Sequence, residues 1–93
     1  MPWGDQYGEV IAALEAGEVV SYSEVARRAG HPSPNRAARS VGWYLAGCDP
    51  GLPWWRVVHK DGSLSAPDKA AQRRHLRREG VEIIDDRVTH GVP

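Results

Sequence analysis

Apolar residues near the N-terminus recur at the spacing of an amphipathic helix. Tyr7, Val10, Ile11 and Leu14 stand at positions i, i+3, i+4 and i+7, which places their side chains on one face of a helix. Gly17 follows at a place suited to end the helix, because glycine readily adopts the left-handed conformation of a helix terminus. This segment is predicted to be a packing helix.

Capping residues predict two further helices. Ser21 and Glu24 have the Ser-x-x-Glu spacing of a capping box, and the helix that they start should cover residues 22–29. Ser33 can cap a third helix over residues 34–46. Its first residue is a proline, which is tolerated there because the N–H of the first helical position has no partner within the helix. A glycine follows each helix. Two short helices joined by a tight turn form a helix-turn-helix, in which the second helix usually lies in DNA.

Short regular elements alternate with turns in the rest of the chain. Residues 54–59 are predicted to be extended and to end in a turn at 60–62, after which residues 63–65 could return against them. Residues 68–79 are rich in helix formers and are followed by a glycine, so they predict a fourth helix.

The C-terminal residues complete the expected architecture. Residues 81–84 and 87–89 can pair as a hairpin, the wing of a winged helix. Hydrophobic residues make up 41% of the 93 residues, and the 7 prolines and 10 glycines fit an ordered domain with many turns. We expect residues 1–93 to form a single winged helix-turn-helix domain, mainly α with small β elements.

Several classes of protein and site are disfavoured. No segment approaches the roughly 20 apolar residues that cross a bilayer, and the first five residues lack the basic start and apolar core of a secretory signal. We therefore expect a cytoplasmic location without membrane contact, at the nucleoid if the protein is bacterial. Cys48 is the single cysteine and the four histidines are scattered, so we expect no disulfide, no metal and no cofactor.

Charge is unevenly distributed although the net charge is zero. Residues 1–24 carry five acids and no Lys or Arg, whereas residues 25–60 carry six bases against Asp49 alone. A positively charged surface attracts a polyanion, so the middle of the chain is the candidate nucleic-acid face. Charge alone fits equally well with arginines that only keep a surface soluble.

Three segments stand out together: residues 17–22 (Gly-Glu-Val-Val-Ser-Tyr), 35–42 (Asn-Arg-Ala-Ala-Arg-Ser-Val-Gly) and 53–58 (Pro-Trp-Trp-Arg-Val-Val). In this order they resemble the DNA-binding domain of the O6-alkylguanine-DNA alkyltransferase family. The likeness covers roughly residues 7–79, and the ordered set is far more specific than any one segment.

The third segment differs from that of active members, which reads Pro-Cys-His-Arg-Val. There the cysteine takes the alkyl group and the histidine helps to hold it as a thiolate. Here Trp54 and Trp55 occupy these positions, and an indole neither attacks an alkyl group nor relays a proton at neutral pH. The chain resembles the alkyltransferase-like branch, which has the first tryptophan and marks lesions for nucleotide excision repair. Many of that branch keep the histidine, so Trp55 is a departure.

The resemblance implies a protein that is not an enzyme and that binds double-stranded DNA containing O6-alkylguanine, with nucleotide excision repair proteins as candidate partners. Arg39 would fill the space left by the flipped nucleotide, Arg36 would contact phosphate, and Tyr22 would push against the target phosphate. Small residues would let the third helix enter the minor groove. The expected DNA-binding residues are Tyr22, Arg36, Ala38, Arg39, Ser40 and Gly42.

The same resemblance implies an apolar pocket for the damaged base, because aromatic and aliphatic walls stack on an alkylated ring without demanding further polar groups. Trp55 is expected in the core. Trp43, where the family usually has a small residue, either packs beneath a loop or flanks the groove, and Glu79 is expected to stabilise the end of its helix. The expected pocket residues are Tyr22, Leu45, Pro53, Trp54, Val57 and Leu64.

Two other hypotheses remain open at this point. Cys48 could replace the lost nucleophile, but it lies six residues before Trp54 and has no partner histidine at the matching place. Alternatively, the chain could be a winged-helix regulator that reads an undamaged operator.

Overall fold

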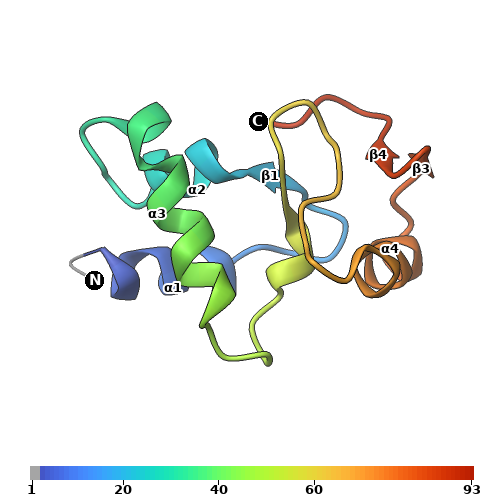
Figure 1. Cartoon of the computed structure of the whole chain (residues 1–93), viewed down its shortest axis with the longest axis horizontal. Coiled ribbons are helices and arrows are strands. Elements are labelled where there is room, and N and C mark those ends of the chain that lie inside the picture. The colour runs from blue at the N-terminus through green and yellow to red at the C-terminus, as the bar shows by residue number, and fades with distance from the viewer. Residues whose placement is uncertain (1–2) are drawn as a thin grey trace.

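The computed structural model describes residues 3–93 (Figure 1). None of the helices in this part of the chain is long and apolar enough to cross a membrane. The expected fold class, mainly α with small β elements, is confirmed. The elements in chain order are α1 (Gly4–Ala12), β1 (Val20–Ser21), α2 (Tyr22–Arg28), α3 (Pro34–Ala46), the 3₁₀ helix η1 (Trp54–Arg56), β2 (Val57–Val58), α4 (Lys69–Arg78), β3 (Ile83–Ile84) and β4 (Arg87–Val88).

Two apolar cores lie on either side of a short parallel strand pair. β1 and β2 pair with Val20 opposite Val57, and both residues belong to a first core with α1, α2 and α3. Their neighbours Val19 and Val58 belong to a second core, which includes Leu76 of α4. Successive side chains of a strand point to opposite faces, so this pair supplies both cores. In Figure 1, β1 accordingly lies between the three N-terminal helices and α4.

Helices α2 and α3 form the predicted pair. The hydroxyl of Ser21 caps α2 by accepting a hydrogen bond of 3.2 Å from the backbone N–H of Glu24. At the other end Gly30 has a φ of +90°, and the N–H of His31 bonds the carbonyl of Ala26, which closes the helix with a Schellman motif. The bounds of α3 coincide with those predicted, although the Ser33 side chain makes no capping hydrogen bond and Gly47 has a φ of −121°, outside the left-handed region.

The end predicted for the first helix is wrong. α1 ends at Ala12, although Leu14 is buried in the first core. The apolar spacing therefore continues beyond the helix, because a residue in the following turn still packs inward. Gly17 has a φ of +85° in the later turn that leads to β1, and it does not end α1.

Residues 54–56 form a 3₁₀ turn, η1, and not the predicted extended segment. The side chains of Trp55 and Arg56 both donate hydrogen bonds to Glu79. Two successive residues of an extended strand point to opposite faces, so both can reach one carboxylate only from a turn. The extended conformation begins at β2, whose parallel pairing with β1 joins segments that are remote in the sequence.

The wing is a short antiparallel hairpin of β3 and β4, as predicted. Asp85 and Asp86 connect the strands with φ angles of 53° and 55°, which a two-residue type I′ turn requires. Ser63 returns against residues 54–59 as expected, since its carbonyl accepts a hydrogen bond of 3.0 Å from the N–H of His59, and it also forms a bridge with Arg87 of β4. The segment after the 60–62 turn therefore extends the wing.

Candidate nucleic-acid interface

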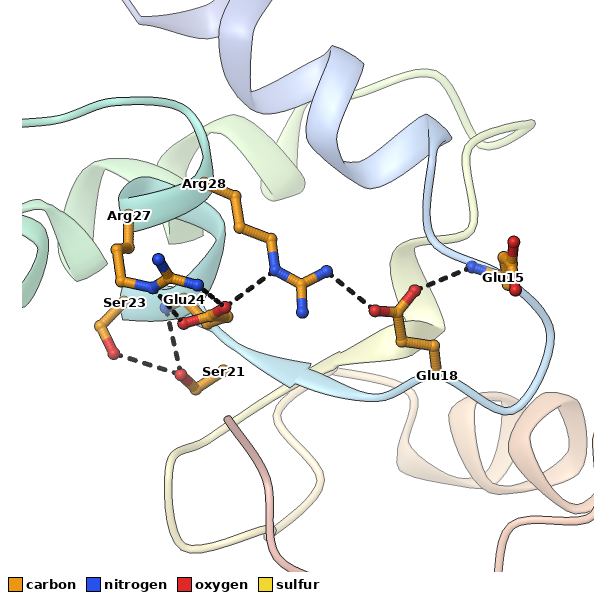
Figure 2. A network of polar contacts seen from close by, with 7 residues as sticks. All are labelled: Glu15, Glu18, Ser21, Ser23, Glu24, Arg27 and Arg28. Carbon is orange, nitrogen blue, oxygen red and sulfur yellow. Dashed lines mark hydrogen bonds and ion pairs between the residues drawn. The ribbon is translucent and has the colours of Figure 1, made fainter.

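Part of the positive charge in the middle of the chain is neutralised within the protein. Figure 2 shows the carboxylate of Glu24 between Arg27 and Arg28, whose Nε atoms each donate to it at 2.8 Å. Arg28 also donates to Glu18 at 2.8 Å. The hydrogen bond from Arg27 lowers the pKa of Glu24 to about 2 against the opposing effect of burial, and Arg28 adds to the lowering. These arginines therefore offer little free charge to a polyanion.

Among the arginines of residues 25–60, those on helix α3 remain free of an ion pair. Arg36 and Arg39 are exposed and form no ion pair with any residue of the described chain, 3–93. Arg56, in contrast, is paired with Glu79 at 2.6 Å, and both side chains are largely buried. Of the five arginines in residues 25–60, the two without a counter-charge therefore lie on α3, which is the candidate DNA face.

The outer surface of α3 is slim beside these arginines. A β-carbon added at Gly42 would meet no atom within 4 Å beyond its own helix and chain neighbours, so none of the described residues requires a glycine there. Glycine inside a helix is less favourable than alanine by about 1 kcal/mol. Ala37 packs in the first core, while Ala38 is half-buried. The open space at Gly42 leaves room for another molecule to approach the helix closely.

Ser40 differs from the other expected DNA-binding residues. Its hydroxyl lies 2.7 Å from the hydroxyl of buried Tyr7 and donates to the carbonyl of Ala37 at 2.8 Å. These bonds turn the side chain toward α1, so the structure gives Ser40 a role in joining α3 to α1. Its assignment to the DNA face stays a prediction.

A cavity of about 530 Å³ opens beside α3, within the size range of small-molecule sites. Four of the expected pocket residues line it: Tyr22, Leu45, Trp54 and Val57. Gly42 also lies in its wall, so the cavity adjoins the face that carries Arg39. The sequence had not identified the remaining part of the wall, which includes Cys48, Pro50, Ser65, Ala66 and Gln72.

Two expected pocket residues, Leu64 and Pro53, do not line the cavity. Leu64 is 2% exposed and packs in the second core. Its neighbour Ser65 faces the cavity, as the alternation of side chains along an extended segment requires. Pro53 precedes η1 and is half-buried outside the cavity wall, where Pro50 of the preceding loop lies instead. Both assignments are corrected.

Gln72 holds the wall in place. It is fully buried, and its side-chain oxygen accepts hydrogen bonds from the N–H groups of Ser65 and Ala66 at 3.1 and 3.0 Å. Its side-chain nitrogen donates to the carbonyl of Val57 at 3.0 Å. The spacing of four residues between Gln72 and Leu76 places both on the buried face of α4, which is the signal that could have identified it.

Tyr22 is the first residue of α2 and also lines the cavity. Burial raises the pKa of its phenol, so the hydroxyl is neutral at physiological pH and able to donate a hydrogen bond. Its ring lies 5.5 Å from that of His59 in the turn before the wing. A neutral donor in the wall of an apolar cavity can contact a phosphate without bringing a charge into the site.

The two adjacent tryptophans have different surroundings. Trp54 lines the cavity, whereas Trp55 packs against the second core and stacks on His75 with ring centroids 4.1 Å apart. The ring of Trp54 is nearly perpendicular to both of these rings, with centroids 5.7 Å from Trp55 and 5.6 Å from His75. This placement agrees with the expectation of one tryptophan in the pocket and one in the core, and it fixes the orientation of the Trp54 indole.

Cys48 lies in the cavity wall, but its surroundings do not activate it. Burial raises the pKa of the thiol, which keeps it in the protonated and poorly nucleophilic form. Among the described residues that line the cavity, none is a histidine, lysine or arginine that could stabilise a thiolate. The arrangement favours binding of an apolar group over covalent transfer to the protein.

Comparison with known families agrees with this arrangement. A model of the 6-O-methylguanine DNA methyltransferase DNA-binding domain matches residues 4–81. The chain belongs to this family. The matched residues include all four helices and the cavity wall.

Curated relatives carry the names DNA base-flipping protein and alkyltransferase-like protein. The DNA base-flipping protein of Escherichia coli (strain K12) is 44% identical over 79 residues, which is 81% of this chain and 59% of that protein's length. The DNA base-flipping protein of Vibrio parahaemolyticus is 38% identical over 80 residues, 82% of this chain and 77% of that protein. Alkyltransferase-like protein 1 of Schizosaccharomyces pombe is 36% identical over 81 residues, 81% and 72% of the two chains.

Solved structures show the same fold. S. pombe Atl1 in complex with damaged DNA containing O6-carboxymethylguanine has a TM-score of 0.78 at 30% identity, covering 89% of this chain and 80% of that chain. A variant of the Mycobacterium tuberculosis protein OGT has a TM-score of 0.72 at 24% identity, covering 92% and 53%. The winged helix-turn-helix architecture of this chain is thus shared with both proteins.

Proposed function

We propose that this protein binds duplex DNA containing O6-alkylguanine, rotates the damaged base into the cavity beside α3 and holds it there with the alkyl group in place. The bound complex then flags the lesion for nucleotide excision repair. One observation carries the proposal. Trp54, which stands where active members of the family have their reactive cysteine, lines an apolar cavity next to α3, and Arg36 and Arg39 of this helix are unpaired.

The proposed sequence of events begins at α3. Its slim surface at Gly42 lets the helix approach the minor groove, which is only about 6 Å wide in undistorted DNA. Rotation of a nucleotide out of the stack costs a few kcal/mol. Arg39 occupies the vacated space and offers planar donors to the orphaned base, while Tyr22 contacts the phosphate of the rotated nucleotide. These contacts offset the cost of unstacking.

The cavity supplies selectivity for the alkylated base. Leu45, Trp54 and Val57 form an apolar wall that stacks on a purine and accommodates a hydrophobic substituent. The indole of Trp54 has no group that can attack the alkyl carbon, and the thiol of Cys48 is held protonated by burial. The lesion therefore persists in the complex, which is what a marker for another repair system requires.

The proposal is tested by titrating the protein with one duplex, with and without a single O6-methylguanine, followed by intact-mass measurement of the protein. We expect tighter binding to the lesion duplex and an unchanged protein mass, with the parent and a Cys48→Ser variant behaving alike. Equal affinity for both duplexes would favour the winged-helix regulator instead. A mass gain of one methyl group that disappears in Cys48→Ser would show that the protein is an alkyltransferase.

A further inference from the structure

Trp43 is the large hydrophobic residue with the greatest exposure in the described chain. Its side chain is 72% exposed, and Ile84 of the wing, at 58%, is the other exposed large hydrophobic residue in residues 3–93. An indole offers a large apolar area whose burial is strongly favourable. The alternative in which Trp43 packs beneath a loop does not hold, so its apolar surface is left for a contact outside the chain.

The position of Trp43 on α3 indicates which surface covers it. Arg36, Arg39 and Trp43 follow each other at helical spacings of three and four residues and are all exposed, so they share one face. Trp43 lies one turn beyond Arg39, about 6 Å along the helix axis. Its neighbour Gly42 lines the cavity, but Trp43 does not. The indole therefore continues the cationic face along the helix and lies outside the base pocket.

We infer that Trp43 is a second DNA contact of α3, packing its indole against the sugar and phosphate wall of the minor groove one helical turn from Arg39. The inference rests on the proposed function. Minor-groove proteins combine basic side chains with apolar side chains that enter the groove and bend the duplex, and the two unpaired arginines make this face complementary to DNA. Because Trp43 lies outside the cavity, it strengthens binding without distinguishing the alkylated base from guanine.

Affinity measurements on both duplexes test this inference. Trp43→Ala should weaken binding to the lesion duplex and to the normal duplex by a similar factor of about ten, the scale of one aromatic contact with nucleic acid. Trp43→Phe should retain part of the affinity. Ile84→Ala, which removes the other exposed hydrophobic side chain, should bind like the parent. All variants should melt like the parent, because neither residue is buried.

A second measurement observes the indole directly. In protein labelled with 5-fluorotryptophan, the resonance of Trp43 is identified by its loss in Trp43→Phe, and its solvent-isotope shift should fall when the lesion duplex binds. An unchanged isotope shift together with parental affinity of Trp43→Ala would overturn the inference. A parent protein without lesion preference would contradict the proposed function, while a tenfold loss in Trp43→Ala on both duplexes would still support the contact.

Discussion

The indole N–H of Trp55 donates a hydrogen bond of 2.9 Å to the carboxylate of Glu79. Trp55 stands where active members of the family have a histidine, so the tryptophan keeps a donor to the acid while it removes the group that relays a proton. Arg56 and the N–H of Gly17 bind the same carboxylate. Glu79 thus joins η1, the end of α4 and the turn after α1, which is a structural role.

Replacement of Glu79 should destabilise the fold. Glu79→Ala leaves the largely buried guanidinium of Arg56 and the indole N–H of Trp55 without their acceptor, and we expect the free energy of unfolding to fall by about 3 kcal/mol. Urea denaturation measures the change. Glu15→Ala, at an exposed glutamate, serves as the matched control and should stay within about 0.5 kcal/mol of the parent. Equal stability of the two variants would contradict the role of Glu79.

Stability should fall in acid as two carboxylates are protonated. Burial opposes ionisation of Glu79, but hydrogen bonds from Arg56, Gly17 and Trp55 outweigh it, so the pKa of Glu79 is about 2, as is that of Glu24. Both pKa values lie below the ordinary 4.5. The unfolded chain therefore binds more protons between these values, and stability that is complete above pH 4.5 is lost as the pH falls towards 2.

Denaturation at several pH values between about 7 and 2 measures this loss. A Glu24→Gln/Glu79→Gln variant should be less stable at neutral pH and should show a flatter dependence below the ordinary pKa of 4.5. If parent and variant have parallel profiles, these two carboxylates do not account for the acid sensitivity.

Gly42→Ala should change stability and DNA binding in opposite directions. The added methyl group meets no protein atom outside the helix, so the unfolding free energy should rise by about 1 kcal/mol through improved helix propensity. The same methyl group projects into the cavity wall and the face that approaches DNA, so affinity for the lesion duplex should fall several-fold. A variant that gains stability and binds DNA like the parent would show that DNA does not approach α3 at this point.

The two free arginines of α3 should have separable roles. Arg39→Ala should lower both the affinity, by about tenfold, and the population of flipped base, whereas Arg36→Ala should lower affinity alone and reduce the salt dependence by the slope of about one phosphate contact. A fluorescent base analogue beside the lesion reports the flipped population. If Arg39→Ala unstacks the base as fully as the parent does, Arg39 is an ordinary phosphate contact.

The helices were the predictable part of the fold, because their signals are local. Ser33, Pro34 and Gly47 mark both ends of α3 in the sequence, and two aspartates with positive φ fit the turn of the wing. η1 was not predictable, since its conformation depends on Glu79, more than twenty residues further along the chain. The pairing of β1 with β2 was not predicted either, because it also joins segments that are remote in the sequence.

The cavity was predictable only in part. The resemblance placed Tyr22, Leu45, Trp54 and Val57 in its wall, but Leu64 was assigned one residue away from Ser65, and in an extended segment that error exchanges the two faces. The sequence alone could not show which arginines carry free charge, because the acids that neutralise Arg27, Arg28 and Arg56 come from outside the basic region.

The central claim is that the protein covers an O6-alkylated guanine without removing the alkyl group, and protection from an active alkyltransferase tests it most directly. The lesion duplex is saturated with the protein, an active alkyltransferase is added, and methyl transfer is followed over time and again after the protein is removed. We predict that transfer slows in proportion to occupancy and then reaches completion on the released duplex. Transfer at the uninhibited rate under saturation, or a duplex recovered without its methyl group before the active enzyme is added, would contradict the account.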